Sequence, residues 1–212
     1  MDLHVVRNPM RHVFAFALAL LSLATRVEAS GTVPAKTSGP VTILLQFDQE
    51  HNDMSLEEMK RELTAIMKEA GLKFEFRMLQ DVTTGDSFND LVVVKFRGKC
   101  RMDVVPQLLD ERGPLAFTHS ADGRILPFSE VECDRIRLSI SSAMYGADRK
   151  KADLLLGRAL GRVVAHEIYH IVGNTKKHGH NGVAKTSLSA TQLISDKLVL
   201  HEHDVDRIQH GH

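Results

Sequence analysis

The 212-residue chain contains no tryptophan, only two tyrosines and two cysteines, and no excess of charge. Its 27 basic residues are balanced by 27 acidic ones. A protein without net charge has no general attraction for nucleic acid or for an anionic membrane surface, so we expect no nucleic-acid partner. Neither cysteine has the CxxC neighbour that is common in structural zinc sites, and this argues against a site of that kind.

Long hydrophobic runs are also lacking, since a transmembrane helix needs about 20 apolar residues. The apolar run from Val13 to Ala24 is shorter than this, follows two arginines and precedes small residues that end at Ala29. This order is typical of a secretory signal peptide, with an uncleaved membrane anchor as the alternative. We expect a secreted or periplasmic protein with no membrane span after cleavage, divided into a signal peptide (1–29), a flexible lead-in (30–40) and a single domain (41–212).

The two cysteines, Cys100 and Cys133, both lie in the expected mature part of the chain. In an oxidising compartment an even number of cysteines is generally bridged. The sequence therefore predicts a disulfide between them, with Cα atoms about 5–6 Å apart.

Short apolar runs alternate with helical patterns along the expected domain. Ser55 and Glu58 form a capping-box pattern at the start of an amphipathic helix that Gly71 ends. An Asp-Gly turn between two apolar runs predicts a hairpin. Together these patterns predict an α+β domain with a mixed β-sheet. The expected strands are residues 41–47, 72–79, 91–97, 115–119 and 125–133.

Three further segments are less regular. A short helical turn is expected within residues 103–113, and one more helix within 186–200, starting near Ser187 or Ser189. The histidines from position 201 onward are interpreted as part of a solvated tail.

A long helix, expected from Asp148 to Val172, contains the sequence His-Glu-Ile-Tyr-His at 166–170. Two glycines, at 157 and 161, are expected to allow close packing against the sheet rather than to break this helix. His166 and His170 lie four residues apart, so they share one helix face and both imidazoles can reach one ion. Glu167 is rotated by about 100 degrees from His166, where it can meet a metal-bound water.

A catalytic zinc ion usually has three protein ligands and one open position. Gly173 ends the helix, and the chain can then turn back so that His178 completes the site. Two alternatives remain for the third ligand, namely His180 and Glu202.

The pattern HExxHxxG followed by a histidine resembles the zincin metallopeptidases, and most closely their metzincin branch. His166, Glu167, His170 and Gly173 match this pattern position by position. The resemblance implies a zincin-like fold, in which the histidines bind zinc and the glutamate is the general base. The chain also resembles short exported bacterial proteins that are described as metallopeptidases.

The chain departs from the metzincin pattern at two points. That pattern would place the third histidine at Lys176, whereas His178 follows two residues later. No methionine follows Met144, so the Met-turn of the family is absent from this sequence.

These observations predict a secreted zinc-dependent endopeptidase that binds one Zn²⁺ through His166, His170 and His178. Zinc-activated water would hydrolyse peptide bonds of a peptide or protein substrate, with Glu167 as the general base. Tyr169 and Tyr145 are considered as oxyanion partners, but neither is assigned to the catalytic set. The alternatives are a non-catalytic exported zinc-binding module and a histidine-rich structural protein.

Overall fold

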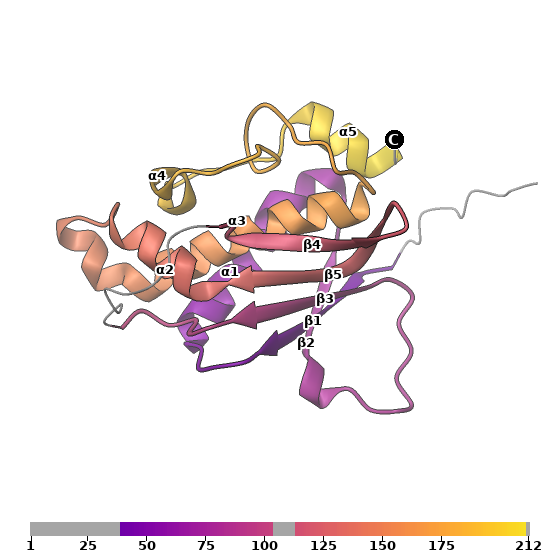
Figure 1. Ribbon diagram of the computed structural model, residues 1–212, viewed down its shortest axis with the longest axis horizontal. Helices are drawn as coiled ribbons and strands as arrows, with labels where there is room; N and C mark the ends of the chain where they lie inside the picture. Colours follow the sequence, from indigo (N-terminus) through magenta and orange to yellow (C-terminus); the bar gives the residue numbers. More distant parts are fainter. Residues whose placement is uncertain (1–38, 104–112, 211–212) are drawn as a thin grey trace, which may run out of the picture. The chain divides into compact units, whose positions relative to one another are not determined.

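A mixed β-sheet with strand order β2-β1-β3-β5-β4 forms the centre of the fold (Figure 1). The computed structural model describes residues 39–103 and 113–210, which belong to one compact unit spanning Lys36–His212. Four strands are parallel, and β4 pairs antiparallel with β5 at one edge. The strands are β1 (Val41–Phe47), β2 (Phe74–Met78), β3 (Leu91–Arg97), β4 (Ala116–Ala121) and β5 (Arg124–Glu132).

This arrangement confirms the predicted α+β class with a mixed sheet. The predicted signal peptide and nearly all of the lead-in lie outside the described residues, as does most of the segment 103–113. The helices are α1 (Asp53–Met67), α2 (Cys133–Ser141), α3 (Ala152–Val172), α4 (Ala190–Ile194) and α5 (Glu202–His210), with 3-10 turns at Lys68–Ala70, Leu79–Asp81 and Gly146–Lys151. None of these helices is long and apolar enough to cross a membrane.

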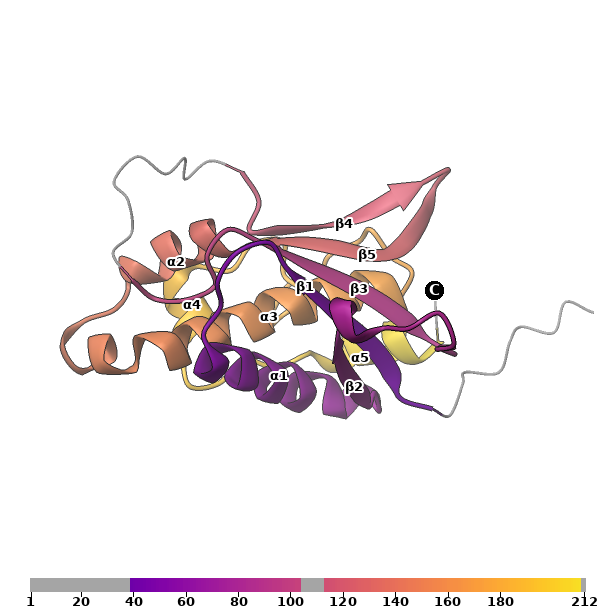
Figure 2. The ribbon, with the colours of Figure 1, turned by 90° about the horizontal axis from the view of Figure 1, so that it is seen from below.

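Helices α1 and α3 lie side by side against the sheet (Figure 2). A Cβ atom on Gly157 would lie 2.5 Å from the carbonyl oxygen of Ser55 in α1, and one on Gly161 would lie 2.8 Å from that of Met59. The two glycines therefore allow close packing of α3 against α1, and the prediction that they face the sheet is wrong. The unbroken run of α3 through both glycines is confirmed, although the helix begins at Ala152 because the preceding residues form a 3-10 turn.

The start of α1 also differs from the prediction. Asn52 is the N-cap, and its side-chain oxygen accepts hydrogen bonds from the backbone amides of Met54 and Ser55. Ser55 lies inside the first turn, where its hydroxyl donates to the carbonyl oxygen of Asp153 at 2.9 Å. The predicted capping box is wrong because this serine joins α1 to α3. Gly71, with φ of 75°, ends the helical segment as predicted.

The hairpin and the disulfide both agree with the sequence predictions. Asp122 and Gly123 have φ of 50° and 79°, as a tight two-residue turn between β4 and β5 requires. Cys100 and Cys133 form a disulfide with Cα atoms 5.1 Å apart. Cys133, however, begins helix α2 rather than ending a strand, and α2 was not predicted.

The carboxy-terminal part is more ordered than the sequence indicated. Ser189 caps α4, which is shorter than the predicted helix. Residues 202–210 form α5 and are not a tail, because Asp204 and Ile208 are buried against the rest of the fold. The histidines at 201, 203 and 210 are nevertheless exposed to solvent, as predicted. Figure 1 shows α5 beside the carboxy-terminal end of α3.

Candidate metal centre

Three histidine side chains converge at the carboxy-terminal half of α3. His166 and His170 lie one helical turn apart on α3, and His178 comes from the loop that follows the helix. One ring nitrogen from each histidine lies within 4.8 Å of the other two. The ring centroids form a near-equilateral triangle, with sides of 4.7 Å, 5.2 Å and 4.8 Å. The three predicted ligands are therefore brought together.

Backbone carbonyls fix the two α3 rings. The Nδ1 atom of His166 lies 2.8 Å from the carbonyl oxygen of Val183, and that of His170 lies 2.6 Å from the carbonyl oxygen of Thr175. Since a carbonyl only accepts hydrogen bonds, both Nδ1 atoms must donate, and each neutral ring carries its lone pair on Nε2. This carbonyl support is typical of metal-ligating histidines.

The two Nε2 atoms face each other at 3.1 Å. Burial lowers the pKa of His166 to about 4 and also lowers that of His170, so both rings are neutral near pH 7. Two lone pairs with no proton between them repel each other, whereas a shared cation relieves this repulsion. The chemistry of the three imidazoles therefore fits a metal ion.

Glu167 points away from the two α3 rings and toward strand β4. Its Oε2 atom accepts a hydrogen bond from the Thr118 hydroxyl at 2.6 Å, and the Thr118 hydroxyl is 2.8 Å from that of Ser129. The Glu167 side chain is nearly buried. Burial raises its pKa to about 7, and the hydrogen bond from Thr118 opposes this shift. A carboxyl group with such a pKa can both accept and release a proton near neutral pH.

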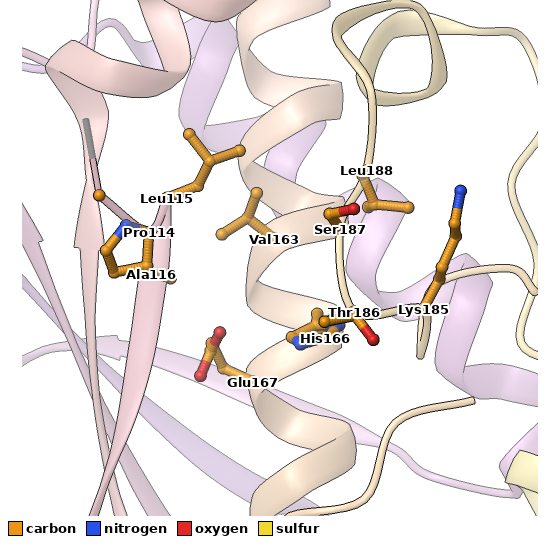
Figure 3. A pocket seen from close by; sticks show the side chains of 11 residues that line it. Pro114, Leu115, Ala116, Val163, His166, Glu167, Lys185, Thr186, Ser187 and Leu188 are labelled. Atoms are coloured by element: carbon orange, nitrogen blue, oxygen red, sulfur yellow. The ribbon is translucent and has the colours of Figure 1, made fainter. Parts of the chain in front are cut away.

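Two open cavities meet at Glu167 and His166. One is lined by the three histidines, Glu167 and strand β4. The other, of about 220 Å³, extends from Glu167 between the start of β4 and the segment 185–188 (Figure 3). Its apolar side chains include Leu115, Val163 and Leu188. A ligand in these cavities would contact the three histidines and an apolar recess together.

The other residues weighed from the sequence are not part of this cluster, although the Tyr169 ring packs edge-on against the His170 ring, with centroids 5.2 Å apart. In the described part of the chain, the group of possible metal ligands does not include His180 or Glu202. Tyr169 is fully buried, and its hydroxyl donates to the carbonyl oxygen of Lys177. Tyr145 is 75% exposed near the opposite end of α3.

Sequence reasoning missed the partners that orient the site. Thr118 and the carbonyl groups of Thr175 and Val183 were not identified, because backbone carbonyls carry no signature in the sequence. Thr118 is a polar residue in a strand that the sequence predicts. The signal for its role was a polar side chain on the strand face that meets α3.

No protein-family model matches the chain, and a search of curated proteins finds no match. The geometry and chemistry of the site itself are therefore what indicate its function.

Proposed function

We propose that this chain is an exported zinc-dependent endopeptidase of zincin-like fold. The observation that carries the proposal is the placement of Glu167, a 5% exposed carboxyl in the same cavity as three converging imidazoles. A protein that only binds a metal has no need of this carboxyl beside its ligands. The disulfide supports export, because disulfides persist in oxidising compartments.

Zinc is the ion that the donor set favours, and when bound it would supply a Lewis acid that activates water and polarises the scissile carbonyl. Glu167 takes a proton from the attacking water and delivers it to the leaving amine. Thr118 holds Oε2 of Glu167, so the other carboxylate oxygen is left to face the water. The carbonyl groups of Val183 and Thr175 keep the two α3 rings in the neutral tautomer that binds a metal.

A peptide substrate is favoured by the position of β4. This strand is one of the two edges of the sheet, and its residues Ala116 to Thr118 line the cavity that contains the three histidines. An extended peptide can pair with such an edge through main-chain hydrogen bonds. The apolar recess beside Glu167 then receives a substrate side chain, and its lining favours an aliphatic one.

Metal analysis and peptide cleavage together test this function. The purified mature protein is expected to contain one zinc ion per chain and to cleave a peptide library next to aliphatic residues. A chelator should abolish cleavage, and added zinc should restore it. One zinc ion per chain without any cleavage would instead identify a non-catalytic binding module. A protein that binds no zinc would exclude both functions.

A further inference from the structure

Both neighbours of His178 in the sequence are held by contacts outside the histidine cluster. The carbonyl oxygen of Lys177 accepts a hydrogen bond from the Tyr169 hydroxyl at 3.1 Å. On the other side, Gly179 lies so close to α5 that a Cβ atom there would be 2.5 Å from Oδ2 of Asp204. The loop segment that carries His178 is therefore packed between the end of α3 and helix α5.

Helix α5 also contacts Tyr169 through Arg207. The guanidinium of Arg207 donates to the Tyr169 hydroxyl at 2.5 Å, and the Arg207 stem lies against Gly173 at the end of α3. One hydroxyl thus joins α5 to the backbone immediately before His178. Tyr169 is fully buried, so the packing around its ring keeps the hydroxyl in a fixed position.

Asp204 is the second contact of α5 with the loop. It is only 2% exposed, and its Oδ1 atom has no hydrogen-bond partner among the described residues. This oxygen lies 3.6 Å from Nδ1 of His203 in the same helix, whereas Oδ2 faces Gly179. The buried Asp204 side chain therefore packs against the loop backbone at Gly179.

The loop needs this support because His178 itself is poorly enclosed. His178 is exposed, whereas His170 is buried and His166 is partly buried. The start of the loop is already fixed, because the carbonyl oxygen of Thr175 accepts a hydrogen bond from Nδ1 of His170. The direction of the His178 ring therefore depends on the backbone from Lys177 to Gly179.

We propose that helix α5 positions the third metal ligand, with Tyr169 and Arg207 as positioning residues that act through the Lys177 carbonyl. The inference rests on the proposed metal site and extends it to helix α5, which packs behind the loop that carries His178. Tyr169, which lies inside the motif, then serves the metal through the loop and does not contact substrate.

A double-mutant cycle on zinc affinity tests this inference. Tyr169→Phe keeps the buried ring and removes only the hydroxyl. Its effect on the zinc dissociation constant is measured by chelator competition, in the parent protein and in the His178→Ala variant. We expect Tyr169→Phe to weaken zinc binding by about 10–100-fold in the parent, as loss of a supporting contact does at other metal sites. In the His178→Ala background the same change should have little effect.

Two further variants test whether the effect is specific to the contact between Arg207 and Tyr169. Arg207→Met keeps the aliphatic stem over Gly173 and should weaken zinc binding in the same His178-dependent way. Gln209→Ala changes an exposed side chain of the same helix and should leave the affinity unchanged. Thermal unfolding with chelator present shows whether each variant remains folded without metal.

The outcomes separate this inference from the proposed function. Equal losses in the parent and in the His178→Ala background would overturn the positioning role, because Tyr169 would then act on α3 or on the fold. An unchanged affinity in both Tyr169→Phe and Arg207→Met would overturn it as well. Either result leaves the peptidase proposal standing if the parent binds zinc and cleaves peptides, whereas a parent without zinc removes both.

Discussion

Glu167 and His166 are neighbours on α3, and burial moves their pKa values in opposite directions. The pKa of Glu167 rises to about 7 and that of His166 falls to about 4, because desolvation disfavours the charged form of each group. Near neutral pH the imidazole of His166 is therefore uncharged, and the carboxyl of Glu167 is about half ionised. Neutral imidazoles are ready to bind a cation, and the carboxyl group is poised between its two protonation states.

This shift predicts the pH dependence of stability for metal-free protein. The folded-state pKa of Glu167 lies above its ordinary value of 4.5, so the folded protein binds this proton more tightly than the unfolded chain. The stabilising effect is complete below pH 4.5 and is lost as the pH rises through 7. Relative to Glu167→Gln, the parent should lose about 2–3 kcal/mol of unfolding free energy between pH 5 and pH 8.

Urea unfolding of both proteins, with chelator present, measures this difference. The opposite contribution of His166 is common to both proteins and cancels in the comparison. Parallel pH profiles would show that Glu167 is not desolvated in solution.

The assignment of His178 as the third ligand leads to a second prediction about single residues. His178 belongs to the histidine cluster, and His180 does not. His178→Ala should weaken zinc binding by more than the 10–100-fold that is typical for loss of a supporting contact. His180→Ala should leave the affinity nearly unchanged. Chelator competition with both variants measures this, and the reverse order of effects would assign the ligand to His180.

The sequence allowed prediction of the three histidines but not of the groups that orient them. The spacing of His166 and His170 alone places them on one helix face. The contact of Thr118 with Glu167 instead joins residues 49 positions apart. Such a contact depends on how β4 lies against α3, and no local pattern encodes that arrangement.

At the level of elements, the packing of α3 against α1 determines where the histidines stand. Gly161 allows this approach, since a Cβ atom there would meet the Met59 carbonyl oxygen and the Glu62 side chain at 2.8 Å. Alanine normally stabilises a helix interior by up to about 1 kcal/mol over glycine. Here the clash should exceed that gain, and Gly161→Ala should destabilise the protein by about 1–2 kcal/mol.

Gly85 offers the matched control, because the space around its Cβ position is open and its φ is not positive. Gly85→Ala should change the unfolding free energy little. If Gly161→Ala proved as stable as the parent in urea unfolding, the tight contact between α1 and α3 would be absent in solution.

Elements with strong local signals were predicted, and those defined by tertiary contacts were not. Residues 41–47 and 91–97 were expected as strands and are β1 and β3. Helix α2 was missed, although Cys133, Ile136 and Ile140 form a buried stripe at helical spacing. Apolar residues such as Phe128 and Val131 alternate with polar ones up to Cys133, so the sequence does not mark where the strand ends. Helix α5 was missed because its many polar residues resemble a tail, and its burial depends on the loop after α3.

At the scale of the whole molecule, the disulfide ties the segment after β3 to the start of α2. Cys100 and Cys133 are both buried and lie 33 residues apart in the sequence. Replacing both with serine removes the cross-link and so raises the conformational entropy of the unfolded chain. The expected loss is about 3–4 kcal/mol of unfolding free energy, from the loop-entropy relation.

Denaturant unfolding of the double serine variant against the oxidised parent measures this loss. Mass spectrometry without reductant should show the parent lacking free thiols. Two free thiols in exported protein would contradict the disulfide.

The proposed activity depends on the whole fold, because a helix, a loop and the edge strand each contribute to one site. α3 supplies two histidines and Glu167, and the following loop supplies His178. The edge strand β4 contributes Thr118 and lines the cavity. The combination of a metal centre with a nearby proton acceptor is what distinguishes an enzyme from a metal-binding module.

Glu167→Gln tests that distinction most directly, since it preserves the size of the side chain and all three imidazoles. Zinc content and the turnover number on the best library peptide are measured for the variant and the parent. Zinc should remain at one ion per chain, while turnover falls by about 10²–10⁴-fold, as expected for loss of a general base. Unchanged turnover in a zinc-loaded Glu167→Gln variant would contradict the assignment of this chain as a zinc peptidase that uses Glu167.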